Sequence, residues 1–208
     1  MKTNLKKTIE TYNEIAHHYK KKTKDLELID EISKFKKFLP KNAKVLDAGC
    51  CWGRDSKILA KSATVTGIDL SEKLLDLARA YVPKAKFKVG NISKTEFAGE
   101  SFHGIWCNDT LIHLERKDIL PTLKEFHRLL KRNGILYLSV KEGEGEGFKE
   151  EEMSNFLPRF YTWFKKDEIT KYCKQAGFRT IEVEVFYEKK RLGLKRDLGI
   201  ITCFAEKI

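Results

Sequence analysis

The chain has 208 residues, a length that suits one domain with a sizeable core and is short for two. Hydrophobic residues make up 41% of it and charged residues 34%, an ordinary balance for a water-soluble protein. No apolar run approaches the roughly 20 residues that a membrane-spanning helix needs, and no apolar segment of a secretory signal follows the basic N-terminus. The sequence therefore predicts a single domain over residues 1–208, in the cytoplasm and apart from membranes.

The net charge of +11 leaves binding to RNA or DNA open, because lysine and arginine neutralise phosphates. Most of the basic residues are lysines, which genome composition alone can produce. The five cysteines are odd in number and include no C-x-x-C pair, so we expect reduced thiols rather than disulfides or a zinc site. His17, His18, His103 and His127 show no ligand spacing, which predicts that no metal is bound.

The first 40 residues are predicted to form two helices. Apolar residues recur at helical spacing from Ile9 to Tyr19 and again from Leu28 to Leu39, and Pro40 ends the second run. From Lys44 onward, short apolar runs alternate with helical patterns. Strands are expected at Lys44–Ala48, Thr64–Ile68, Lys86–Val89, Gly104–Asn108 and Ile135–Val140, with helices near Arg54–Lys61, at Ser71–Tyr81 and ending over Phe126–Lys131 before a stop at Asn133-Gly134.

The last third of the chain begins with KEGEGEG at Lys141–Gly147, where glycine occupies every second position and predicts a mobile loop. A helix is expected at Lys165–Ala176, then strands at Arg179–Phe186 and Gly199–Ala205 joined by a long basic connection. Strands alternating with helices indicate a parallel sheet covered on both faces. Because no helix separates the last two strands, we predict a doubly wound α/β fold whose seven-stranded sheet is mostly parallel, with one antiparallel strand near the C-terminus.

The motif that carries the chemistry lies in Val45–Asp55, where an apolar strand runs into Asp47 and then into a turn with Gly49 and Gly53. In an open α/β sheet, ligands bind beyond the carboxyl ends of the strands, over this first strand–helix turn. A carboxylate fixed there would repel a pyrophosphate, whereas it suits a ligand with a cationic amine and no phosphate. S-adenosylmethionine is such a ligand.

Three later strand ends complete the candidate site. Asp69 ends the second strand about 20 residues beyond the glycine turn, where a carboxylate can accept both hydroxyls of a ribose. Asn91 and Ile92 follow the third strand, where the edge of an adenine would lie. Asn108 ends the fourth strand, beneath the expected methionine moiety.

These residues resemble the class I S-adenosylmethionine-dependent methyltransferases, and the match runs in order from roughly Tyr12 to Phe178. The family's first motif reads D-x-G-x-G-x-G, whereas this chain has D-A-G-C-C-W-G, so that Cys51 replaces the middle glycine. The resemblance implies a Rossmann-like fold with S-adenosylmethionine as cofactor. It implies contacts to the methionine end from Asp47 and Gly49, to the ribose from Asp69, and to the adenine from Leu70, Asn91 and Ile92. Gly53, the last glycine of the motif, is also expected to bind the cofactor.

The resemblance also implies that the N-terminal helices, residues 1–40, cover the cofactor site. Tyr19 would then reach the methionine end and Tyr12, on the same helix face, the substrate, although both rings could simply pack the helix. Arg54 could pair with the cofactor carboxylate or with Asp55. His113 is the candidate general base, because its unperturbed pKa is near neutrality, and a structural hydrogen bond is the alternative.

Residues 141–164 are expected to form the substrate side of the site. Within them, Arg159 and Tyr161 could clamp a carboxylate, stack on a base or anchor the segment to the core. The acidic stretch Lys141–Glu152 should repel RNA phosphates. We therefore predict methyl transfer to the nitrogen or oxygen of an unidentified small molecule. A tRNA or other RNA methyltransferase, and a non-catalytic cofactor-binding partner protein, remain alternatives; the oligomeric state is not predicted.

Overall fold

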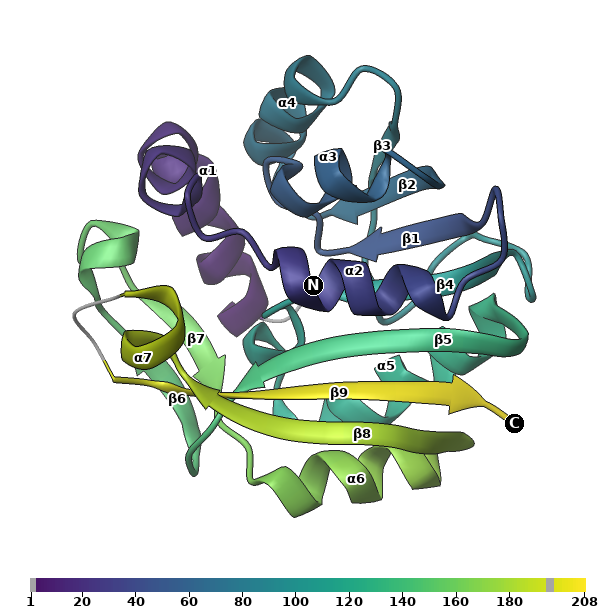
Figure 1. Cartoon of the computed structure of the whole chain (residues 1–208). Helices are drawn as coiled ribbons and strands as arrows, with labels where there is room; N and C mark the ends of the chain where they lie inside the picture. The colour runs from purple at the N-terminus through teal and green to yellow at the C-terminus, as the bar shows by residue number, and fades with distance from the viewer. Residues whose placement is uncertain (1–2, 194–196) are drawn as a thin grey trace.

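The computed structural model describes residues 3–193 and 197–208. Figure 1 shows one central sheet with a helical segment across the end at which the first strands point. The sheet has the order β3-β2-β1-β4-β5-β9-β8, and β9 runs opposite to the other six strands of this sheet. Its strands are β1 (Lys44–Ala48), β2 (Thr64–Asp69), β3 (Lys86–Val89), β4 (Phe102–Cys107), β5 (Leu130–Lys141), β8 (Phe178–Tyr187) and β9 (Gly199–Lys207). The doubly wound fold predicted from the sequence is confirmed.

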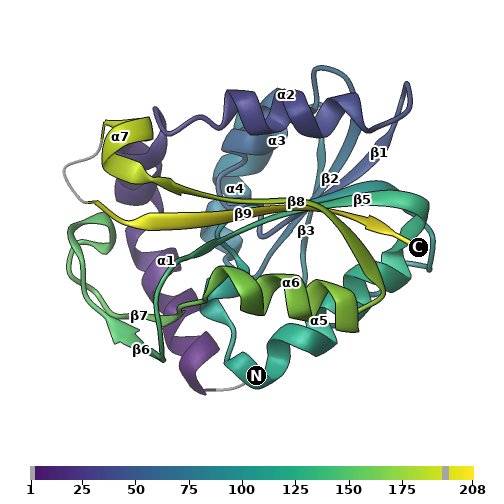
Figure 2. The same cartoon turned by 60° about the horizontal axis from the view of Figure 1, so that its bottom comes forward.

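Helices cover both faces of this sheet, as Figure 2 shows. One face carries α2 (Ile29–Lys37) and α3 (Arg54–Leu59), and the other carries α5 (Arg116–Leu129) and α6 (Lys166–Gln175). Successive strand residues therefore enter different cores: Val45 lies in the cluster that contains Phe35 of α2, whereas Leu46 lies in the cluster that contains Phe126 of α5. This two-sided burial explains why the strands read as nearly continuous apolar runs.

The two N-terminal helices have different tasks. α1 (Thr3–Thr23) crosses the carboxyl end of the sheet and contacts α4 (Glu72–Tyr81). α2 instead buries Ile32 and Phe35 against the sheet, where Phe35 meets the Trp106 ring edge to face at 5.4 Å. The expectation that both helices cover the site is therefore wrong for α2, because its apolar stripe is needed in the core.

The stop predicted at Asn133-Gly134 is misplaced. Helix α5 ends at Leu129 and β5 begins directly at Leu130, so both residues lie inside a strand. Leu130 pairs with Phe102 and Ile135 with Gly104, so the intervening residues of β5 bulge out of the ladder. Asn133 does adopt a left-handed conformation, with φ of 59°. The turn signal was correct locally, but it marks a β-bulge rather than a helix end.

The segment predicted as the substrate side, residues 141–164, contains a second, small sheet, whose first strand begins inside the glycine-rich stretch predicted as a mobile loop. Strands β6 (Glu146–Lys149) and β7 (Arg159–Thr162) pair antiparallel, with the short 3-10 helix η2 (Glu152–Ser154) between them. β7 is anchored to α1, because the Phe160 amide donates to Thr8 Oγ1 at 2.9 Å and Thr11 Oγ1 donates to the Pro158 carbonyl at 2.8 Å. Backbone pairing and these two threonines therefore order a segment that its glycine content alone does not predict.

The predicted hairpin at the C-terminus is present, with β8 paired to β9. Its connection contains α7 (Glu188–Leu192), and residues 194–196 of the predicted basic connection lie outside the described residues. Within the described parts of the chain, no helix is long and apolar enough to cross a membrane.

The turn after β1 places Gly49 in the left-handed region, with φ of +80°. Its amide and that of Cys50 both donate to the Ile68 carbonyl, at 2.8 and 3.0 Å, which fastens this turn to β2. A Cβ on Gly49 would lie 2.2 Å from Thr110 side-chain atoms. Gly145 has a similar φ of +85°, but a Cβ there would meet nothing within 4 Å.

Gly49 and Gly145 provide a matched test of how much the close approach of Gly49 to Thr110 matters for stability. We expect Gly145→Ala to cost about 1–2 kcal/mol, the strain of a left-handed alanine. Gly49→Ala should cost roughly 1–3 kcal/mol more, because Thr110 must move as well. Urea denaturation of both variants measures the difference, and equal losses would show that the approach to Thr110 imposes no constraint.

Candidate active site

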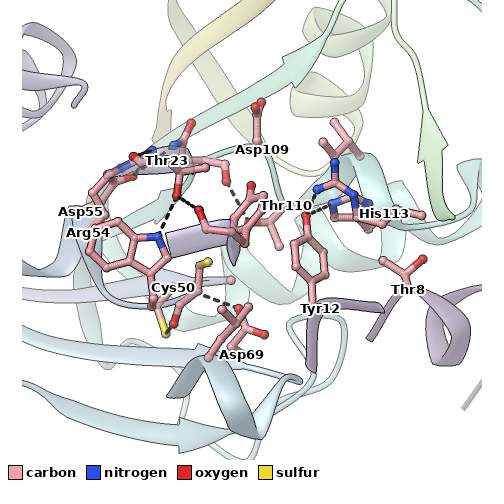
Figure 3. A pocket seen from close by; sticks show the side chains of 18 of the residues that line it. Thr8, Tyr12, Thr23, Cys50, Arg54, Asp55, Asp69, Asp109, Thr110 and His113 are labelled. Carbon is pink, nitrogen blue, oxygen red and sulfur yellow. Dashed lines mark hydrogen bonds and ion pairs between the residues drawn. The ribbon is translucent and has the colours of Figure 1, made fainter. Parts of the chain in front are cut away.

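A cavity lies at the carboxyl ends of β1, β2 and β4, under α1 and beside the β6–β7 hairpin (Figure 3). All but one of the residues predicted from the sequence line it. They are Tyr12, Tyr19, Asp47, Gly49, Arg54, Asp69, Leu70, Asn91, Ile92, Asn108, His113, Arg159 and Tyr161. Gly53 does not line the cavity. It is the N-cap of α3, with φ of 85°, and a Cβ there would lie 3.2 Å from that of Ala78.

Asp69 closes the β1 turn from the neighbouring strand. Its Oδ2 accepts the Cys51 amide at 2.9 Å, and its Oδ1 accepts the Ser71 amide at 2.9 Å. Each oxygen keeps a further lone pair for a ligand hydroxyl. Burial raises the pKa of Asp69 above its usual range, while these two amide donors oppose that rise. The carboxylate is thus held in one orientation at the mouth of the cavity.

Asp47 is the more deeply buried acid, with 2% of its surface exposed. It accepts a hydrogen bond of 2.5 Å from Ser56 Oγ. Burial, and then repulsion from Asp55, raise the pKa of Asp47 to about 8. A buried carboxyl group with a raised pKa suits a site that receives an ammonium group, because the cation would favour its ionised form.

Arg54 pairs with its neighbour Asp55, as one of the two sequence-based alternatives proposed. Its Nε donates to Asp55 Oδ1 at 2.7 Å, and the pair joins a partly buried arginine to a buried aspartate rather than lying on the surface. Asp55 Oδ2 also accepts Trp106 Nε1 at 2.9 Å and Asn108 Nδ2 at 3.1 Å. Asp55 thus connects α3 to β4, and most of the donor capacity of Arg54 is used inside the protein.

The two asparagines differ in how much of their side chain is free to meet a ligand. Asn108 donates to Asp55 and accepts from Ser139 Oγ at 2.6 Å, so both ends of its amide are engaged within the protein. Asn91 Oδ1 accepts the Ser93 amide at 2.9 Å, which forms a local turn after β3. Ile92 beside it is 5% exposed and packs in the main core.

Helix α1 forms the roof of the cavity. The rings of Tyr12 and Tyr19 meet edge to face at 5.2 Å, which combines the packing and the ligand-facing interpretations of these residues. Asn13 Oδ1 accepts Ser71 Oγ at 2.8 Å and the Lys73 amide at 3.2 Å, and so ties α1 to the start of α4. Ser71 caps α4, because its Oγ accepts the Leu74 amide.

Tyr12 links His113 to Arg159, and Figure 3 shows the tyrosine and the histidine pointing toward each other. The Tyr12 hydroxyl lies 2.8 Å from His113 Nε2 and accepts Arg159 Nη1 at 2.7 Å. His113 Nδ1 lies 2.7 Å from the Phe160 carbonyl, which can only accept, so Nδ1 carries the proton and Nε2 accepts from Tyr12. Burial, and then the Arg159 charge, lower the pKa of His113 to about 4. The histidine is therefore neutral and a weak base.

Several lining residues were not among those predicted, notably Thr23, Trp52, Asp109, Lys141 and Glu151. Lys141 is 5% exposed and donates to Asp109 at 3.1 Å, at the tips of β5 and β4. Both residues lie at strand ends, and that position would have allowed their prediction from the sequence. Trp52 donates from Nε1 to Thr23 Oγ1 at 2.9 Å, a contact between distant segments that leaves no pattern in the sequence.

Known proteins resemble this chain in sequence and in structure. A family model described as a methyltransferase domain matches residues 45–134. A ubiquinone biosynthesis O-methyltransferase from Aromatoleum aromaticum is 29% identical over 84% of this chain and 83% of that protein. A demethylmenaquinone methyltransferase from Chlorobaculum parvum is 31% identical over 67% of each. The solved 1,6-didemethyltoxoflavin-N1-methyltransferase of Burkholderia thailandensis, with S-adenosylhomocysteine bound, has a TM-score of 0.67 and is 23% identical over 85% of this chain and 76% of its own.

A doubly wound sheet with a cavity over its first strand–helix turn is the architecture of proteins that bind nucleoside-containing cofactors. The chain belongs to the class I S-adenosylmethionine-dependent methyltransferases. It is an enzyme of that family, and its cofactor is S-adenosylmethionine.

The raised pKa of Asp47 makes stability without cofactor depend on pH. The folded pKa of about 8 lies above the unfolded value near 4, so the wild-type chain loses stability as the pH rises from about 4 to about 8. Asp47→Asn keeps an acceptor for Ser56 and removes the titration. We expect thermal melts to show the variant gaining on wild type by roughly 1 kcal/mol per pH unit across that window.

The exposed Asp76 on α4 supplies the control, since Asp76→Asn removes a carboxyl group that is 58% exposed. The stability of this control relative to wild type should not increase as the pH rises. A stability difference for Asp47→Asn that stays constant over the same window would mean that Asp47 is ionised in the folded protein without cofactor.

Proposed function

We propose that this enzyme methylates an oxygen or nitrogen of a small molecule bound in the cavity beneath α1. The proposal is carried by the roof over the cavity, because α1 and the β6–β7 hairpin are hydrogen-bonded to each other above the strand ends. The tyrosines at positions 12, 19 and 161 all line the space under that roof. Relatives named for ubiquinone biosynthesis and for demethylmenaquinone support a small acceptor of this kind.

The cofactor would be held by residues of the strand tips. Asp69 would accept the ribose hydroxyls with its remaining lone pairs, and Asp47 would meet the ammonium group of the methionine end. Leu70, Asn91 and Ile92 would line the adenine. Arg54 would have a smaller share in binding the methionine carboxylate than the sequence suggested, because Asp55 already engages two of its nitrogens.

The bound cofactor supplies a methyl group that is already activated by the sulfonium. The chain's own residues would therefore orient the acceptor and exclude water. His113 Nε2 accepts a hydrogen bond from the Tyr12 hydroxyl. It could instead accept one from a hydroxyl group of the substrate that is to be methylated. Because the pKa of His113 is about 4, the imidazole would position the substrate hydroxyl but would not keep its proton. The proton would leave to solvent.

Asp69→Asn tests the ribose role while retaining an acceptor for one backbone amide. We expect S-adenosylhomocysteine to bind roughly 1.5–3 kcal/mol more weakly, because a charge-assisted hydrogen bond is lost. Isothermal titration calorimetry measures the change, and Asp76→Asn on neighbouring α4 should leave the affinity as in wild type. Unchanged affinity in Asp69→Asn would remove this residue from the cofactor contacts.

Methyl-labelled S-adenosylmethionine tests the acceptor class directly. Label should pass to a component of a small-molecule extract, with hydroxylated aromatic compounds tested first, and not to bulk tRNA. Labelling of tRNA that weakens steeply with salt would support the RNA alternative instead. Cofactor binding without transfer to any fraction would support the non-catalytic alternative.

A further inference from the structure

Arg159 is a buried cation at the wall of the cavity. It belongs to β7, and 2% of its surface is exposed. Its guanidinium carbon lies 5.1 Å from the ring centre of Tyr12, 5.5 Å from that of Tyr19 and 5.3 Å from that of Tyr161. A full charge removed from water needs partners that satisfy its donors. The hydrogen bonds of Arg159 therefore show what the position is built to hold.

Those hydrogen bonds engage two of the three guanidinium nitrogens. Nη1 donates to the Tyr12 hydroxyl at 2.7 Å, and Nη2 donates to Glu151 Oε1 at 2.5 Å. Nε is buried and has no hydrogen-bond partner among residues 3–193 and 197–208. Nε and Nη2 lie on the same edge of the guanidinium plane, and that edge matches the two oxygens of a carboxylate. Arg159 thus uses only half of an edge that suits a carboxylate.

Glu151 occupies this edge with a single oxygen. The same Oε1 accepts both Arg159 Nη2 and the Tyr161 hydroxyl, each at 2.5 Å. Glu151 immediately precedes η2, in the short connection between β6 and β7, rather than in the main sheet. A carboxylate supplied by a ligand could take both of these bonds and satisfy Nε as well, if Glu151 moved aside.

We propose that the methyl acceptor carries a carboxylate, which displaces Glu151 and binds side-on to the Nε–Nη2 edge of Arg159 and to the Tyr161 hydroxyl. Glu151 is then an internal stand-in for the substrate, which neutralises Arg159 while the site is empty of acceptor. The tyrosine rings around the guanidinium favour an acceptor with a flat aromatic or conjugated body. This assignment rests on the proposed function, since it concerns the acceptor side of the same cavity.

Benzoate is a suitable probe, with benzamide as its uncharged counterpart, each titrated into protein saturated with S-adenosylhomocysteine. Glu151→Gln retains an acceptor for Arg159 and Tyr161 but removes the competing charge, so benzoate should bind at least tenfold more tightly than to wild type. Glu150→Gln removes one charge from the exposed neighbouring residue and should bind benzoate as wild type does. Benzamide should not distinguish these proteins.

Arg159 variants complete the test. Arg159→Gln should abolish benzoate binding, and Arg159→Lys, which keeps the charge without the two-donor edge, should weaken it at least tenfold. Benzoate binding that is equal in the Glu151→Gln and Glu150→Gln variants, or that survives Arg159→Gln, would overturn the proposal. The affinity of each protein for S-adenosylhomocysteine distinguishes the two possible failures. If all variants bind S-adenosylhomocysteine normally and benzoate equally well, only the carboxylate acceptor is refuted. If the wild-type protein does not bind S-adenosylhomocysteine, the proposed site as a whole is refuted.

Discussion

Two carboxyl groups at the tips of neighbouring parallel strands govern the rest of the site. In the β1–β2 pairing Asp47 lies opposite Gly67, and Asp69 comes two residues further along β2. The chain after β1 must therefore turn over the tip of β2, and the Cys51 amide does so by donating to Asp69. Glycine at position 49 permits that turn beneath Thr110. The backbone, the two acids and the floor of the cavity are consequently one unit.

Cys51 departs from the family motif without breaking this unit. The middle glycine of the motif is replaced, yet Cys51 adopts the left-handed conformation, with φ of 53°, and its amide still reaches Asp69. What the turn needs at this position is the backbone amide and its direction, which cysteine supplies at the expense of some backbone strain. The departure from the motif therefore does not argue against cofactor binding.

The sequence allows prediction of the sheet and of the site residues that lie at the ends of its strands. Alternating strands and helices gave the sheet, and the positions of Asp47, Asp69 and Asn91 followed from the rule that parallel strands end at one edge. The bulge at Asn133 could not be predicted, because the same Asn-Gly pair stops helices and kinks strands. The β6–β7 hairpin was missed because its order comes from backbone pairing and from α1, not from an apolar pattern.

The acceptor side of the cavity depends on contacts between distant segments. Tyr12 and Arg159 were both predicted to face the substrate, but their hydrogen bond joins residues 147 positions apart. Its existence depends on the docking of α1 against β7, which no local pattern encodes. The role of Glu151 follows only from that docking. The sequence therefore predicts which residues face the substrate, but not which of them contact one another.

We propose that Asp47, whose pKa burial raises to about 8, is protonated without cofactor and meets the ammonium group of the bound cofactor. Binding of S-adenosylhomocysteine should ionise it, because an ammonium group lowers the pKa of a nearby carboxyl group. Calorimetric titration at pH 7 in two buffers that differ in ionisation enthalpy measures the protons exchanged. The account predicts release of about one proton per ligand bound, and none from Asp47→Asn. Equal binding enthalpies for wild type in the two buffers would contradict it.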